Sequence, residues 1–342
     1  MRIGITYDLR SDYLARGYSK AETAEFDSPV TIDGIAGALT RAGHEVERVG
    51  GLDALIEALA AGRSWDLVFN IAEGMHGYGR EAVIPALLEA RGIACTFSDP
   101  LALAVCLHKP TTKRVVRDAG VPTPEFAVIA TMADLDGFAL PFPVFAKPVA
   151  EGTSKGVTGS SLVHDAAQLA EVCERLLAAH SQPVLVERYL PGREFTVGIV
   201  GSGAKAKSIG VMEVLVGGKG GSDAVYCYDT KQEYLDRVTY HLATDAQAQA
   251  AAELAVDAWR ALDCRDAGRV DVRLDENGQP RFIEANPLPG LHPIDSDLPI
   301  ICRLGGIEYD TLIRAIVAGA CERCGLDGEA RTGRIPAAGE VQ

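Results

Sequence analysis

Several features are scarce or missing in this chain of 342 residues, and each absence excludes a class of protein. Positive charge is scarce, because 33 lysine and arginine residues stand against 47 aspartate and glutamate residues, which gives a formal net charge of −14. A general binder of nucleic acid or of anionic membranes needs the opposite balance. We therefore predict no nucleic-acid partner, and any anionic ligand has to be held by local positive charge.

Long apolar runs are missing as well. The apolar run at residues 1–7 is far shorter than a signal peptide, and no stretch approaches the ~20 apolar residues of a membrane-spanning helix. The eight cysteines stand mostly in apolar or helical contexts, which is typical of a reducing compartment. We therefore expect a cytoplasmic protein without a membrane partner. Cys321 and Cys324 form a CxxC without a second pair, and we interpret them as structural, with redox or metal chemistry as the alternative.

Two common nucleotide-binding signatures are also absent. Residues 2–95 alternate predicted strands with predicted helices, a pattern typical of a parallel sheet with helical crossovers. This region is Rossmann-like, but no G-x-G-x-x-G follows its first strand, which argues against an NAD-dependent enzyme. No GxxxxGK[ST] motif occurs either, so a Walker-type phosphate loop is excluded.

The local patterns predict the individual elements. Apolar residues at helical spacing indicate helices, and apolar–polar alternation indicates strands. In the first region the predicted strands are 2–7, 44–49, 66–71 and 92–95, and the predicted helices are 31–42, 52–61 and 81–91. Further along, the predicted strands are 125–129, 143–147 and 157–163, and the predicted helices are 101–107, 112–119, 166–179, 246–262 and 309–324.

The order of these elements predicts an α/β fold with three domains. The alternation of strands and helices ends near residue 97, and long strands begin near residue 184. We expect an N-terminal domain with a Rossmann-like parallel sheet (1–97), a central α+β lobe with a glycine-rich phosphate loop (98–183), and a C-terminal α+β lobe with the metal and substrate site (184–342). We expect the two α+β lobes to enclose a nucleotide.

The most informative pattern lies near the C-terminus. Two strand-like stretches, 268–275 and 281–287, are separated by the turn sequence DENG, which predicts a hairpin. Antiparallel pairing can bring Asp271, Glu284 and Asn286 to one face. Two carboxylates and an amide oxygen suit magnesium, with nucleotide phosphates completing its shell, better than they suit zinc. The alternative is a surface hairpin with solvated acids.

A glycine-rich loop follows the predicted strand that contains Lys147. Gly152 and Gly156 allow the backbone to close on a ligand, and the hydroxyl groups of Thr153 and Ser154 can bind phosphate oxygens together with exposed N–H groups. The order is strand, loop, strand. Taken alone, this stretch could equally be a flexible hairpin.

A further strand runs into a Pro-Gly break at residues 184–192. Such a break suits a hinge between two lobes, where adenine can bond to backbone groups and a nearby glutamate can bind a ribose hydroxyl. A plain crossover between domains is the alternative.

Together these stretches resemble the ATP-grasp superfamily and, within it, the D-alanine–D-alanine ligase family. The resemblance covers about residues 66–320 well and residues 1–65 weakly. It rests on five blocks that follow one another in the family's order: LHKPTTKRVVRDAGVPTP (107–124), FAKPVAEGTSKGV (145–157), VLVERYLPGREFTVGIV (184–200), GRVDVRLDENGQPRFIEANPLPG (268–290) and SDLP (296–299).

The resemblance implies an ATP-dependent carboxylate–amine ligase that joins two amino acids through an acyl phosphate. Such chemistry depends on charge neutralisation and positioning. The implied cofactors are ATP and two Mg²⁺ ions, with Mn²⁺ possible, the implied substrates are small amino-acid-like molecules, and a homodimer is the usual assembly. Two alternatives stay open: a ligase of a specialised biosynthetic pathway with another substrate pair, and a nucleotide-binding protein without ligase activity.

The resemblance also implies roles for individual residues. The nucleotide-binding set, which would contact phosphates, adenine and ribose, is Lys109, Lys147, Thr153, Ser154, Glu187, Tyr189, Leu190, Glu194 and Lys231. The implied magnesium ligands are Asp271, Glu284 and Asn286. The implied catalytic set, which would stabilise the oxyanion and cover the reacting phosphate, is Arg269, Gly290, Ser154 and Lys231. The implied amino-acid-binding set is Glu25, Glu73 and Ser296.

Four positions depart from the family pattern. Glu73 stands where typical members have a histidine, with His76 close by as the alternative; Gln232 stands where a tyrosine is usual; the block 290–296 is one residue longer; and Glu25 lies in an altered N-terminal signature. All four concern the amino-acid pockets. A carboxylate at position 73 favours a cationic or hydrogen-bond-donating substrate group. We therefore predict that at least one substrate differs from plain D-alanine.

Overall fold

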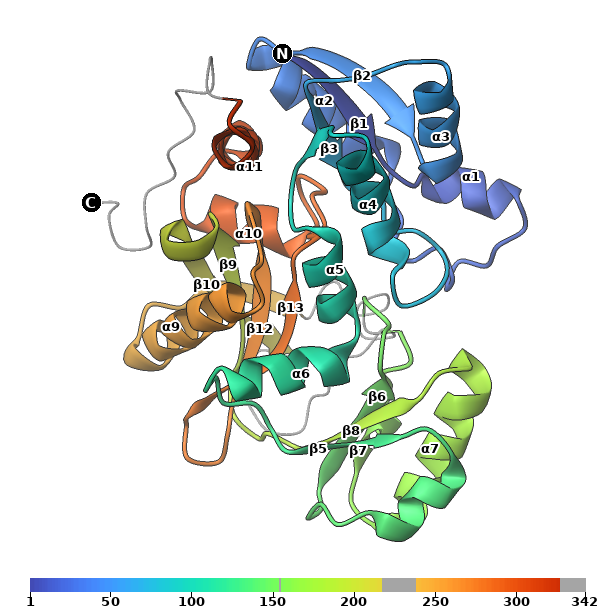
Figure 1. The fold of residues 1–342 in the computed structure, drawn as a ribbon. Helices are drawn as coiled ribbons and strands as arrows, with labels where there is room; N and C mark the ends of the chain where they lie inside the picture. Colours follow the sequence, from blue (N-terminus) through green and yellow to red (C-terminus); the bar gives the residue numbers. More distant parts are fainter. Residues whose placement is uncertain (154, 217–237, 327–342) are drawn as a thin grey trace.

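The computed structural model describes residues 1–153, 155–216 and 238–326. They form three sheets with helices packed against them (Figure 1). Residues 154, 217–237 and 327–342, which include Lys231 and Gln232, lie outside the described residues. Among the helices of the described ranges, none is both long enough and apolar enough to cross a membrane.

The N-terminal sheet is parallel, as the strand–helix alternation predicts. Its strands, in spatial order, are β2 (Glu45–Gly50), β1 (Arg2–Thr6), β3 (Leu67–Asn70) and β4 (Ala94–Cys95). The helices associated with it are α1 (Arg10–Ala15), α2 (Pro29–Arg41), α3 (Leu52–Ala60), the 3₁₀ turn η1 (Arg80–Ala82) and α4 (Val83–Ala90). Leu67 and Phe69 of β3 pack in one core with α2, whereas Val68 between them packs in a second core with α3 and α4. This opposite burial follows from the alternation of side chains along a strand.

The central sheet is antiparallel and smaller. Its strands, in spatial order, are β5 (Phe126–Ile129), β8 (Val184–Arg188), β6 (Val144–Pro148) and β7 (Leu162–Val163). The helical segments around it are α7 (Ala166–His180) and the 3₁₀ turns η2 (Met132–Gly137) and η3 (Gly159–Ser161). The predicted strand 157–163 is wrong over most of its length, because Thr158 accepts a hydrogen bond from the Ser160 N–H and starts η3 instead.

The C-terminal sheet is also antiparallel. Its strands, in spatial order, are β11 (Val238–Leu242), β10 (Lys207–Val216), β9 (Glu194–Val200), β12 (Ala267–Leu274) and β13 (Pro280–Asn286). The helical segments that follow its strands are η4 (Gly203–Lys205), α9 (Ala246–Ala261), α10 (Asp297–Leu304) and α11 (Tyr309–Cys324). Phe195 and Val197 of β9 pack with Trp259 of α9 in one core. Thr196 lies between them and faces the other side of the sheet, toward Asp271.

Two predicted helices pack on a different sheet from the one expected, and one helix was not predicted. Helices α5 (Pro100–Leu107) and α6 (Lys109–Asp118) share the core of the C-terminal sheet through Cys106 and Val116, so this part of the expected central lobe packs on the last one. Helix α10 was not predicted, and Pro299 lies in its first turn, where a proline is tolerated. The domain limits at 97 and 183 stay a prediction.

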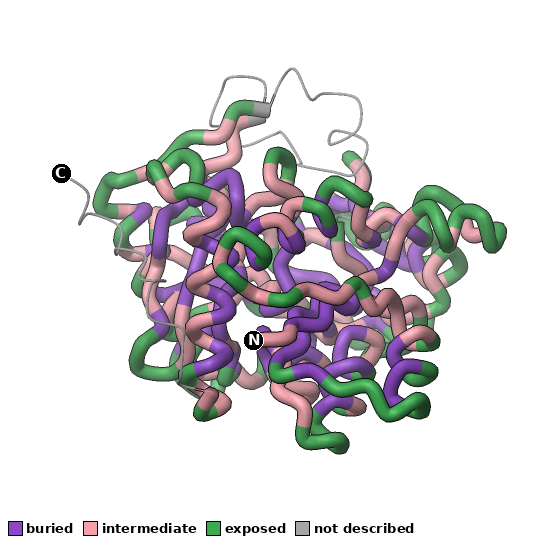
Figure 2. The backbone as a smooth tube through the Cα atoms, turned by 90° about the horizontal axis from the view of Figure 1, so that it is seen from above, coloured by how far each residue is buried: buried purple, intermediate pink, exposed green. Residues whose placement is uncertain are grey.

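Buried residues lie mainly in the interior of the molecule, and exposed residues lie mainly in the outer turns (Figure 2). The central and C-terminal sheets are both antiparallel, and their strands β6, β8, β9, β12 and β13 contribute side chains to one cavity between them. Because strands hold alternate side chains on one face, this arrangement fixes which residues can meet a ligand there.

Candidate active site

The predicted acidic hairpin is confirmed. Strands β12 and β13 pair antiparallel, with Asp271 opposite Glu284 and Arg269 opposite Asn286. The turn is held by the carboxylate of Asp275, which accepts hydrogen bonds from the main-chain N–H groups of residues 277 and 279. The hairpin therefore places two carboxylates and an amide within reach of one another, and the Asn286 Nδ2 donates to Asp271 at 3.4 Å.

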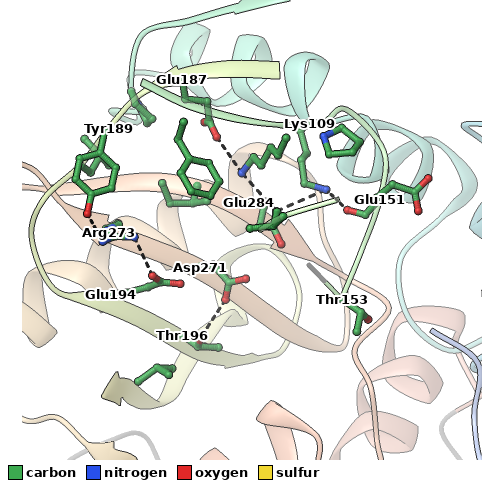
Figure 3. A pocket seen from close by; sticks show the side chains of 18 of the residues that line it. Lys109, Glu151, Thr153, Glu187, Tyr189, Glu194, Thr196, Asp271, Arg273 and Glu284 are labelled. Atoms are coloured by element: carbon green, nitrogen blue, oxygen red, sulfur yellow. Dashed lines mark hydrogen bonds and ion pairs between the residues drawn. The ribbon is translucent and has the colours of Figure 1, made fainter. Parts of the chain in front are cut away.

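A cavity of about 160 Å³, here called the first cavity, lies between the central and C-terminal sheets (Figure 3). Ten of the predicted site residues line it: Lys109, Lys147, Thr153, Glu187, Tyr189, Leu190, Glu194, Arg269, Asp271 and Glu284. Ser154 and Lys231, also predicted for this site, lie outside the described residues. The resemblance had therefore selected side chains that the fold brings together from four segments of the chain.

Lysines and glutamates alternate along this cavity. Buried Glu187 contacts the ammonium groups of both Lys113 and Lys147, the latter at 2.9 Å. The ammonium of Lys147 also lies 3.9 Å from Glu284, and that of Lys109 lies 3.6 Å from the same carboxylate. Three cations are thus interleaved with two carboxylates, an arrangement that can accept further negative charge such as phosphate.

Burial and charge act against each other in this row. Burial lowers the pKa of Lys113 to about 8. Burial also opposes the charged form of Lys147, but Glu187 and Glu284 outweigh it and raise the pKa of that ammonium. In the same way burial is outweighed at Glu284, whose pKa falls to about 2 because of Lys109, Lys147 and Arg269. Lys147 and Glu284 therefore stay charged at neutral pH.

Asp271, the other carboxylate of the hairpin, has a different environment. Burial raises the pKa of Asp271 to about 6, although Arg269 opposes this effect. Thr196 donates a hydrogen bond to Asp271 at 3.0 Å. Within the part of the chain that the structure describes, no group of three His, Cys, Asp or Glu side chains could hold a metal. The oxygen set of Asp271, Glu284 and Asn286 instead fits a hard cation that takes its other ligands from phosphate and water.

A second cavity of about 120 Å³ adjoins the first. The residues common to both linings are Lys109, Glu151, Thr153, Arg269 and Glu284. Of the predicted residues, Glu25, Glu73, Asn286 and Gly290 line the second cavity only. Lys109, Arg269 and Glu284 therefore stand at the junction of the two cavities.

Two residues considered from the sequence are not at these cavities. The side chain of Ser296 accepts a hydrogen bond from the main-chain N–H of His292 at 2.9 Å, and among the described lining residues it belongs to neither cavity. His76 is exposed and also stands outside both linings as described, whereas Glu73 lines the second cavity. Of the two alternatives at this position, Glu73 is the one that faces the cavity.

The glycine-rich loop follows β6 as predicted, and the turn η3 separates it from the short strand β7. Gly156 has a φ of +76°, and a side chain there would overlap Pro148. A side chain at Gly152 would overlap the carboxylate of Glu25, so the loop backbone lies directly against the N-terminal domain. Lys155 of the loop also reaches Glu25, at 2.8 Å. The loop thus forms part of the wall of both cavities.

The sequence analysis missed several residues of the site. Arg273 pairs with Glu194 at 3.1 Å and lies on the same strand face as Asp271, so its spacing of two could have identified it. Lys113 follows Lys109 by one helical turn, which was a comparable signal. Glu81, which lines the second cavity, had no such signal because a long loop separates it from Glu73.

The C-terminal part of the chain matches a known family model. Residues 115–318 match the model described as D-ala D-ala ligase C-terminus. A D-alanine–D-alanine ligase of Xanthomonas axonopodis is 34% identical over 285 residues, which is 81% of this chain and 84% of that protein. This chain belongs to the D-alanine–D-alanine ligase family.

Two further comparisons agree with this family assignment. An uncharacterized protein, y4sG of Sinorhizobium fredii, is 32% identical over 83% of this chain and 85% of its own length. The crystal structure of the Bacillus anthracis D-alanine–D-alanine ligase complexed with ATP has a TM-score of 0.72, with 21% identity, and covers 96% of this chain and 100% of that one. The predicted ATP-grasp fold is confirmed, and family membership confirms the predicted class of ATP-dependent, peptide- or amide-forming ligase.

Proposed function

We propose that this ligase binds ATP in the first cavity and joins the carboxylate of one amino-acid-like substrate to the amine of another at the junction with the second cavity. The observation that carries the proposal is the shared wall, because Lys109, Arg269 and Glu284 line both cavities. A phosphate group in one cavity and a carboxylate in the other would then meet between cationic side chains.

Within the first cavity, the lysines supply the charge for the phosphates. Lys109 and Lys147 are held in place by carboxylates, and Thr153 of the glycine-rich loop lines both cavities. Tyr189 and Leu190 follow β8 and would flank adenine. Glu194 would bind ribose and would then give up part of its contact with Arg273. Ser154 and Lys231 remain proposed phosphate contacts.

The hairpin would hold the divalent cations. Asp271, Glu284 and Asn286 supply only oxygen ligands, as magnesium or manganese requires, and two ions are proposed. When bound, such ions neutralise charge on the phosphates. Arg269 and the Gly290 N–H are proposed to stabilise the oxyanion of the second step, and both lie at the second cavity.

The second cavity is proposed to bind the amino-acid substrates. Glu25 would receive an ammonium group, Glu73 would select the substrate, and Ser296, whose oxygen accepts from the His292 N–H, would donate its O–H to a substrate carboxylate. We also propose a homodimer in the cytoplasm, as is usual in the family. The direct test measures ADP release and product mass with Mg-ATP and a panel of D- and L-amino acids, singly and in pairs. We expect one pair to give ADP and a product whose mass equals both substrates less water.

Two substrate assignments compete within this proposal. D-alanine is the substrate named for the curated relatives, while the glutamates of the second cavity favour another substrate pair. We expect weak ADP release with D-alanine alone, and we expect Glu73→His to raise it relative to the native pair. Efficient synthesis of D-alanyl-D-alanine by the unmodified protein would contradict the second assignment. ADP release that no amino acid stimulates would contradict the ligase proposal itself.

A further inference from the structure

Two glutamates from one loop face the second cavity together. Glu73 follows β3, and Glu81 lies in the turn η1 eight positions later. Gly74 makes their approach possible, since it adopts a φ of +68° and a side chain there would overlap the carbonyl of Arg80. The Gly74 N–H also donates to the carboxylate of Asp8 at 2.8 Å, which anchors the start of the loop.

These two carboxylates lack a protein partner. Glu81 is only 9% exposed, yet its side chain makes no hydrogen bond or ion pair within residues 1–153, 155–216 and 238–326. The side chain of Glu73 also makes no hydrogen bond or ion pair within these residues. Burial raises the pKa of Glu81 to about 7 and, together with the charge of Glu81, raises the pKa of Glu73 well above its ordinary value. Buried charges without partners are costly in a protein interior.

The nearest cations are engaged elsewhere. Arg80 donates to the main-chain carbonyl of Ala150 at 3.0 Å and pairs with Glu25 at 3.4 Å. The other three carboxylates that line this cavity all have ion-pair partners: Glu25 with Arg80 and Lys155, Glu151 with Lys155, and Glu284 with Lys109 and Lys147. The acidic groups of this cavity that form no ion pair within the described chain are therefore Glu73 and Glu81.

An ordinary amino acid brings no net charge to these two acids. It is a zwitterion, so it adds one positive and one negative group. A second ammonium group adds one positive charge and up to three hydrogen-bond donors. Hydrogen bonds between ionised partners are the stronger kind, so they can offset the burial of Glu73 and Glu81.

We propose that the second cavity takes an amino acid with a second ammonium group, which Glu73 and Glu81 bind together. The inference rests on the proposed ligase function and narrows its substrate class. The two carboxylates act by binding and selection.

Pairs of isosteric amino acids test this inference. Diaminopropionate, diaminobutyrate and ornithine are compared with 2-aminobutyrate, norvaline and norleucine, each in D and L form. Calorimetry on the full chain, with Mg²⁺ and a non-hydrolysable ATP analogue, gives the affinity of each. We expect at least one diamino acid to bind at least about tenfold more tightly than its neutral isostere.

Matched variants assign the preference to the two carboxylates. Glu81→Gln and Glu73→Gln should each reduce the preference to about twofold or less, since each leaves a neutral amide of the same shape. Glu89→Gln, on the exposed surface of α4, should leave it unchanged. Thermal unfolding of each variant checks that the fold is kept. Equal binding within every isosteric pair, or a preference that survives in both glutamine variants, would overturn the inference.

The inference and the proposed function fail in different ways. Selective binding of a diamino acid without ADP release from any substrate pair supports the inference and contradicts the ligase proposal. ADP release with neutral amino acids, and equal binding within every isosteric pair, supports the ligase proposal and contradicts the inference.

Discussion

In the first cavity each lysine has a carboxylate beside it, whereas in the second cavity two carboxyl groups form no ion pair within the described chain. The alternating row of Lys113, Glu187 and Lys147 keeps its charges at neutral pH and is complete before any ligand binds. Glu73 and Glu81 instead have raised pKa values. A site whose charges are already paired suits a ligand common to the whole family, while an unbalanced site suits a particular substrate.

The largest effect is expected at the carboxylate that both cavities share. Glu284→Ala removes the side chain that lies opposite Asp271 and between Lys109 and Lys147. ADP release should fall at least about a hundredfold, the scale of losing a major electrostatic group in a site. Glu276→Ala, in the exposed turn of the same hairpin, is the control. Near-normal ADP release by a folded Glu284→Ala protein would contradict the assignment.

The second cavity should affect stability through pH. Because burial raises the pKa of Glu81 from 4.5 to about 7, its contribution is fully favourable below pH 4.5 and is lost as the pH rises through 7. The Glu81→Gln variant lacks this pH dependence. Its unfolding free energy relative to that of the unmodified protein should therefore rise by up to about 3 kcal/mol as the pH is raised from 4.5 to 8. Urea unfolding at both pH values measures it, with Glu89→Gln as the control. An equal offset at both pH values would contradict the expected burial of this charge.

A smaller effect is expected behind the first cavity. Lys113 is fully buried and, in the described lining, belongs to neither cavity, so it acts on the site through Glu187. Lys113→Met should cost about 1–3 kcal/mol in unfolding free energy, because Glu187 keeps Lys147 as a partner. Its affinity for an ATP analogue should fall less than that of Lys147→Met. The reverse order in calorimetry would show that Lys113 contacts the nucleotide directly.

The smallest effect concerns the loop that the two cavities share. Binding of Mg²⁺ and an ATP analogue should increase the protection of residues 150–153 and 155–157 from hydrogen exchange, since phosphate would provide partners for their N–H groups. The control is the outer helix α3, which lies away from both linings as described. Equal protection of the loop with and without nucleotide would argue against its role as a phosphate lid.

Much of the site could be predicted because it follows short-range rules. The spacing of two between Glu284 and Asn286, with a turn before them, was enough to place both on one strand face opposite Asp271. The resemblance then named lysines from three other segments, and the structure places Lys109 and Lys147 at the same carboxylate. Ser296 was a weaker case, because its hydroxyl has a local main-chain partner that no motif reveals.

The sequence by itself determined the alternation of strands and helices, the acidic hairpin and the family, because periodicity, turn residues and ordered motifs are local properties of the chain. Only the tertiary structure decided that Glu73 and Glu81 share a cavity and that Lys113 supports Glu187 from behind. These relations depend on a loop closing at Gly74 and on a helix packing against a distant sheet. Charge balance is a property of the folded interior, since burial and neighbours at close range set it.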